Sequence, residues 1–98
     1  MAYKIKYLPL AVQDLHDIAE YLSQFYPGTA PRVLRTIRDK IANLRDMPEM
    51  YERYEQEPDY RKLPAEQYLI FYKVQEEKQI VEIHRILRAS WNLPQYVK

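Results

Sequence analysis

The spacing of the apolar residues changes once in the main body of this 98-residue chain, and that change constrains the fold most. Between residues 10 and 46, apolar side chains recur every three or four positions, which is typical of the buried face of a helix. From Tyr60 onward, alternating or wholly apolar runs indicate strands. Residues 3–8 also alternate, with apolar side chains on one face and Lys4 and Lys6 on the other. The predicted order of elements is therefore β–α–α–β–β–β.

Two helices are expected, one over residues 10–26 and one from Thr29 to the residue before Pro48. Gly28, the only glycine, lies between them, and we expect it to adopt a positive φ at the end of the first helix. Thr29 is the expected N-cap of the second helix. Asp14 is assigned to the solvent-exposed face of the first helix. Because the connection is short, the two helices should form an antiparallel hairpin.

An acidic connector at residues 47–59 precedes three expected strands, at residues 60–63, 68–74 and 79–88. Pro64 should end the first of these strands, and the second is apolar on both faces, as in a central strand. We therefore predict a single α+β domain over residues 1–98. In it, a two-helix hairpin packs on one face of a small, mostly antiparallel β-sheet. The other face should be open to solvent or covered by a partner.

The composition excludes several classes of protein. The chain has no cysteine, so a disulfide framework, a cysteine-based zinc site and a thiol nucleophile are all excluded. The longest apolar run, Tyr68 to Tyr72, is far shorter than the ~18 residues that span a membrane. Lys4 and Lys6 interrupt the N-terminal segment, so no signal peptide is expected and the cytoplasm is the expected compartment. The net charge of +1 indicates no strong nonspecific binding of nucleic acid.

Basic side chains on the expected strands are the candidates for a functional site. Strand alternation places His84 and Arg88 on one face of the last strand and Arg85 on the other. The ring of His84, with a pKa near ~6.5, is suited to proton transfer. Proteins that recognise RNA often place basic groups beside aromatic side chains. The simpler interpretation of these basic residues is that they are solvent-exposed charges without a functional role. Neither histidine has a metal-ligand partner at a usable spacing, and no P-loop or dinucleotide-binding motif is present.

Several segments resemble the RelE/ParE family of toxins. Pro9 to Leu22 resembles the opening helix of that family, and residues 60–64, 68–74 and 81–87 resemble its strands. The resemblance extends from about residue 3 to residue 92. It implies the fold predicted above and the toxin half of a bacterial type II toxin–antitoxin pair. It also implies a cognate antitoxin as partner, and neither a metal nor a cofactor.

Two mechanisms occur in this family. ParE-like members inhibit DNA gyrase, whereas RelE-like members cleave mRNA on the ribosome without a metal. Leu69 lies where RelE-like nucleases carry a catalytic arginine, and residues 87–92 retain only Arg88 of the expected basic group. Losing one transition-state cation commonly costs ~10²-fold or more in rate. The resemblance therefore favours a ParE-like gyrase inhibitor, with a RelE-like nuclease as the alternative. A third hypothesis is a binding module that acts only as an antitoxin partner or corepressor.

If the protein is a nuclease, the resemblance and the strand pattern together name its candidate residues. Arg61 or Lys62 would orient the phosphate, Arg88 would stabilise the transition state and His84 would exchange a proton. Tyr96 is a weaker candidate that could replace the C-terminal aromatic residue of the family.

Overall fold

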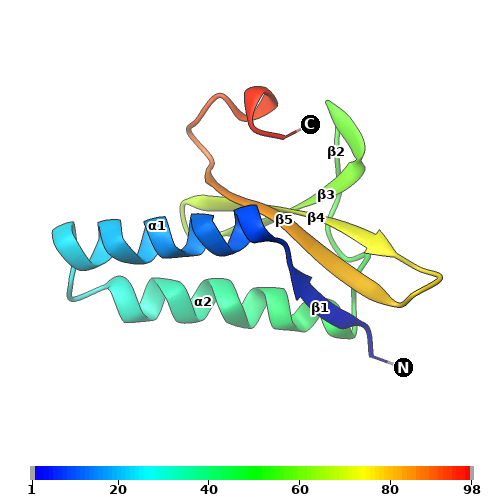
Figure 1. The fold of residues 1–98 in the computed structure, drawn as a ribbon, viewed down its shortest axis with the longest axis horizontal. Coiled ribbons are helices and arrows are strands. Elements are labelled where there is room, and N and C mark those ends of the chain that lie inside the picture. The colour runs from blue at the N-terminus through cyan, green and yellow to red at the C-terminus, as the bar shows by residue number, and fades with distance from the viewer. Residues whose placement is uncertain (1, 98) are drawn as a thin grey trace.

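The computed structural model describes residues 2–97 and contains two helices and a five-stranded sheet (Figure 1). In chain order the elements are β1 (Lys4–Tyr7), α1 (Pro9–Phe25), α2 (Ala30–Ala42), β2 (Arg53–Tyr54), β3 (Glu57–Ala65), β4 (Tyr68–Gln75) and β5 (Ile80–Arg88). Short 3₁₀ helices follow at Asn43–Arg45 and Leu93–Gln95. The predicted α+β class is confirmed. Within residues 2–97, neither helix is both long enough and apolar enough to cross a membrane.

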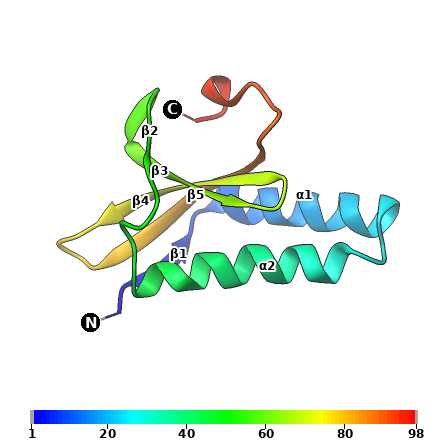
Figure 2. The ribbon, with the colours of Figure 1, turned by 180° about the vertical axis from the view of Figure 1, so that it is seen from behind.

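The sheet has the strand order β1-β5-β4-β3-β2. β1 pairs with β5 in parallel, and every other neighbouring pair is antiparallel. The two helices form an antiparallel hairpin on one face of the sheet, and the C-terminal segment lies on the opposite face (Figures 1 and 2). The helical hairpin and the mostly antiparallel sheet agree with the prediction.

The helices and the sheet enclose the main core. α1 contributes Ala11, Ile18 and Leu22, and α2 contributes Val33, Ile37 and Ile41. These side chains pack against the inner face of the sheet, which includes Ile70, Tyr72, Val81, Ile83 and Ile86. Since burying one such aliphatic side chain stabilises the fold by about 1.5–3 kcal/mol, this contact is the main reason why the hairpin stays on the sheet.

A second, smaller cluster lies on the opposite face, and we call it the outer core. It consists of Tyr54, Tyr60, Phe71, Leu87 and Val97, with Leu69 and Leu93 packed against it. Val97 belongs to the C-terminal segment and is almost fully buried. This face of the sheet is therefore partly covered by the chain itself, a possibility that the prediction of an open or partner-covered face did not include.

The structure corrects the expectation that Pro64 ends a strand. β3 continues through Pro64, which pairs with Leu69 of β4. The backbone N–H of Lys62 points away from β4 and donates to the carbonyl of Glu52. Two residues later, the nitrogen of Pro64 points to the same side, beyond the end of β2. A missing N–H costs little at such an edge.

The structure also corrects three local expectations, two of them fully and one in part. The connector contains the short strand β2, which pairs with β3 and was not predicted. Gly28 has no positive φ. Among residues 2–97 the left-handed residues are Glu66 and Gln79, with φ of 55° and 54°, in the turns before β4 and β5. Thr29 is the N-cap residue of α2, as predicted, but its hydroxyl donates to the carbonyl of Tyr26 and does not cap the helix.

Candidate functional site

A bulge in β5 decides which side chains share a face. Phe71 of β4 pairs with Arg85, but the next residue, Tyr72, pairs with Ile83, so His84 is an extra residue in β5. Beyond such a bulge the alternation of faces is shifted by one. His84 and Arg85 therefore both lie toward the outer face. Arg88 lies on the helix face, so the prediction that it shares a face with His84 was wrong.

His84 belongs to a compact polar group on the outer face. Its ring meets that of Tyr60 edge-to-face with centroids 5.0 Å apart, and Nδ1 lies 3.4 Å from the Tyr60 hydroxyl. Nε2 lies 3.3 Å from a carboxylate oxygen of Glu82, and the Lys73 ammonium sits 4.6 Å above the centre of the Tyr60 ring. Burial lowers the pKa of His84, although Glu82 partly opposes this effect. The ring is therefore mostly neutral at pH 7.

Arg61 and Lys62 lie on opposite faces of β3. Lys62 pairs with Phe71 and lies on the outer face, where its ammonium is 3.4 Å from a carboxylate oxygen of Glu52. Arg61 lies on the inner face with only 14% of its side chain exposed. Its guanidinium donates to the carbonyl of Tyr51 at 2.8 Å. Arg61 therefore anchors the connector and does not approach the outer face.

Arg88 and Tyr96 occupy two further places. The Arg88 guanidinium lies 5.7 Å from the centre of the Tyr21 ring and donates to Gln67. Tyr96 lies on the C-terminal segment, with its ring centre 5.4 Å from that of Trp91 and 5.8 Å from the Arg85 guanidinium carbon. The five predicted site residues therefore do not converge on a single centre. Only His84 and Lys62 share the outer face of the central strands.

Asp14 is a structural centre that the sequence interpretation missed. It was assigned to the solvent, but within residues 2–97 it is the one charged side chain that is buried. Its carboxylate accepts two hydrogen bonds from the Arg85 guanidinium, at 2.8 and 2.9 Å, and one from the backbone N–H of Ile86 at 2.9 Å. A signal was present, because Ala11, Asp14 and Ile18 follow the spacing of the buried helix face.

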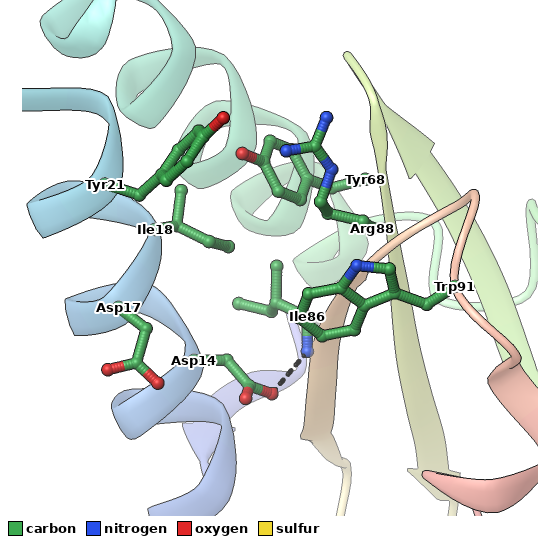
Figure 3. A pocket seen from close by; sticks show the side chains of 8 residues that line it. All are labelled: Asp14, Asp17, Ile18, Tyr21, Tyr68, Ile86, Arg88 and Trp91. Atoms are coloured by element: carbon green, nitrogen blue, oxygen red, sulfur yellow. Dashed lines mark hydrogen bonds between the residues drawn. The ribbon is translucent and has the colours of Figure 1, made fainter. Parts of the chain in front are cut away.

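A pocket of about 310 Å³ opens beside Asp14, between α1 and the end of β5 (Figure 3). Its lining residues are Asp14, Asp17, Ile18, Tyr21, Tyr68, Ile86, Arg88 and Trp91. The walls are mostly aromatic or aliphatic, and Arg88 lies at the end of the pocket near Tyr21 and Tyr68. Such a pocket can hold an apolar group with an anion beside it. Among residues 2–97, no three histidine, aspartate or glutamate side chains are grouped closely enough to hold a metal ion.

The sequence matches one family over residues 5–92, described as "ParE toxin of type II toxin-antitoxin system, parDE". No curated protein matches the sequence significantly.

Solved structures of toxin–antitoxin systems have a similar fold. A chain of the chromosomal ParDE system from P. aeruginosa aligns with a TM-score of 0.76 and 21% identity, covering 89% of this chain and 96% of that one. The RelBE2 complex from Mycobacterium tuberculosis contains a chain with a TM-score of 0.69 and 20% identity, covering 90% and 99%. The intact E. coli RelBE complex contains one with a TM-score of 0.67 and 18% identity, covering 92% and 100%. At these identities the similarity demonstrates a common fold.

Proposed function

The chain belongs to the ParE toxin family of type II toxin–antitoxin systems, and we propose that it arrests growth as a ParE-like inhibitor of DNA gyrase. In this proposal the toxin acts in the cytoplasm and is held inactive by a cognate antitoxin. Structures similar to this chain include the toxin–antitoxin complexes RelBE2 and RelBE, which supports the proposed partner.

We prefer gyrase inhibition because the basic candidate residues lie in different parts of the fold and do not surround one point. Metal-independent RNA cleavage needs several cations and a proton-transfer group around one phosphate. Here Arg61 is committed to the connector, and Arg88 faces α1 rather than His84. Leu69, at the position where the nucleases carry an arginine, packs against the outer core. An inhibitor that acts by binding needs no such convergence.

The proposal is tested by measuring both processes after purified toxin is added. We expect the toxin to inhibit supercoiling of a relaxed plasmid by purified gyrase in proportion to its concentration. Ribosome-bound mRNA, followed by primer extension, should remain intact. Normal supercoiling at a toxin concentration that arrests growth would contradict the proposal.

RNA cleavage is the second candidate function, and the polar group around His84 is the observation that favours it. A mostly neutral imidazole, with Lys62 and Lys73 on the same face, could accept a proton from a ribose 2′-hydroxyl at Nδ1 if the substrate hydroxyl replaces the 3.4 Å contact with Tyr60. Under this mechanism His84→Ala would abolish both mRNA cleavage and growth arrest. Under the gyrase mechanism the same variant should remain toxic, as should the control variant Arg35→Ala, which changes an exposed arginine on α2.

A further inference from the structure

The pocket beside Asp14 is one half of a longer groove. A second pocket of about 220 Å³ lies between the C-terminal half of α1, the start of α2 and the turn before β4. Both pockets are lined by Tyr21, Tyr68 and Arg88. The two hollows therefore adjoin across these three side chains. We call the pair the α1–β5 groove, with a Trp91 end and a Thr29 end.

The two ends of the groove each have room for a bulky apolar side chain. The Trp91 end is mostly apolar, whereas at the Thr29 end Leu22, Tyr26 and Val33 lie beside polar side chains. A dry apolar cavity of about 150 Å³ is enough to bind benzene, so each pocket has room for a large aliphatic or aromatic group. The Trp91 end offers Ile18 and Ile86 as its floor. Trp91 and Tyr21 remain 47% and 39% exposed, so their faces are available for contact. Aromatic side chains left open in this way are typical anchors of a protein interface.

The charges of the groove select for a ligand with a local negative charge. Arg88 lies where the two pockets meet, and no carboxylate within residues 2–97 forms an ion pair with it. The nearby carboxylate of Asp14 is already neutralised by Arg85. An acidic group placed on Arg88 would therefore gain an ion pair and displace none.

We propose that the α1–β5 groove binds a segment of the antitoxin in which two bulky apolar side chains flank an acidic residue. The apolar side chains occupy the two pockets, and the acidic side chain binds Arg88. This inference rests on the proposed function, since it takes the antitoxin as the partner, and it adds where the partner docks and with which residue types.

Other occupants fit the groove less well. A nucleic-acid strand would bring a phosphate at every nucleotide, and Asp17 lines the Trp91 end with a negative charge, whereas Glu66 at the Thr29 end is paired with Arg32. The C-terminal segment of the chain itself is engaged elsewhere, because Val97 and Leu93 pack on the outer core on the opposite face of the sheet. A protein segment with isolated acidic residues between apolar ones places a charge on Arg88 without bringing a charge at every position.

Trp91 is the only tryptophan in the chain, so it provides a direct probe of the groove. The toxin is labelled with 5-fluorotryptophan and titrated with the unlabelled adjacent-gene product that neutralises it in co-expression. We expect the single ¹⁹F resonance to shift on binding. Arg88→Glu should weaken binding at least about 30-fold, as expected for a buried charge pair. Trp91→Ala, measured by calorimetry, should weaken it about tenfold or more.

Matched variants separate this inference from its premise. Arg35→Glu reverses an exposed arginine that lines neither pocket and should change the affinity by less than about twofold. If Arg88→Glu loses its folded far-UV spectrum, Arg88→Gln replaces it, with an expected loss of at least about fivefold. Tight binding that is unchanged by the Arg88 and Trp91 variants would contradict the groove as the docking site, but the antitoxin would still be the partner. The absence of any neutralising partner would overturn this inference and the proposed antitoxin, while the supercoiling assay separately decides gyrase inhibition. A shift of the resonance with single-stranded RNA would assign the groove to nucleic acid instead.

Discussion

Asp14 shows how one buried charge can connect two elements that are far apart in the chain. β1 pairs with β5 only as far as Ile83. Beyond Ile83, the edge of β5 that faces away from β4 has no strand beside it. The carboxylate of Asp14 accepts the N–H of Ile86 at this edge and also the Arg85 guanidinium. The carboxylate thus accepts, at the bulged part of β5, a backbone hydrogen bond that a neighbouring strand would otherwise accept. The pair draws α1 onto the sheet at the point where the pocket begins.

Asp14→Ala should lower the free energy of unfolding by about 3–5 kcal/mol, because the change leaves a partly buried guanidinium and a strand N–H without their acceptor. Urea unfolding followed by circular dichroism measures this loss. Asp17→Ala is the matched control, since Asp17 is an exposed aspartate one turn away and should change the stability by no more than about 0.5 kcal/mol. Equal stability of the two variants would show that the Asp14 carboxylate is not held as described.

At the scale of the elements, the acidic connector between α2 and β3 is held by inward-pointing side chains from the sheet. The Tyr72 hydroxyl, on the inner face of β4, donates to the carbonyl of Pro48 at 2.8 Å. Arg61 donates to the carbonyl of Tyr51 in the same segment. Burial raises the pKa of Tyr72 to about 12, so this donor stays protonated throughout the physiological range. The connector is therefore fixed in place although it has little regular structure.

Tyr72→Phe should cost about 1–2 kcal/mol, because it removes the hydroxyl donor and leaves a carbonyl with no partner while preserving the ring. The connector should also become more accessible, which limited proteolysis at Arg53 by trypsin would detect as faster cleavage. Tyr26→Phe, at an exposed tyrosine, serves as the control and should change neither quantity. Unchanged proteolysis of the Tyr72 variant would indicate that the connector is held by other contacts alone.

At the scale of the whole molecule, the two cores lie on opposite faces of the same central strands. Phe71 of β4 belongs to the outer core, whereas Ile70 and Tyr72 on either side of it belong to the main core. Because the two cores share these strands, unfolding one core would expose the other to solvent. We infer from this arrangement that residues 2–97 fold as one unit.

The protein should accordingly unfold in one cooperative step. Fluorescence of Trp91 reports on the end of β5 and on the C-terminal segment, and far-UV circular dichroism reports mainly on the helices. The two signals should give the same urea midpoint. A fluorescence transition at clearly lower urea, with the helical signal intact, would mean that the outer core and the C-terminal segment open independently.

The sequence by itself determined the features that depend on local periodicity. The two-helix hairpin follows from apolar spacings of three and four residues. The strands β4 and β5 follow from runs that are short, apolar and bounded by polar turns. These patterns predict the class and layering of the fold because each element must bury its apolar face against another.

Only the tertiary structure decided where the functional side chains lie. One extra residue in β5 moves Arg88 to the helix face, and nothing in the sequence around His84 marks that bulge. Pro64 is tolerated because β2 ends before it, which depends on a neighbour rather than on the residue. Asp14 is buried because Arg85, 71 positions later, meets it across the sheet edge. Pairing between distant segments sets these features, since strand registers and buried charge pairs are satisfied by partners that local sequence does not contain.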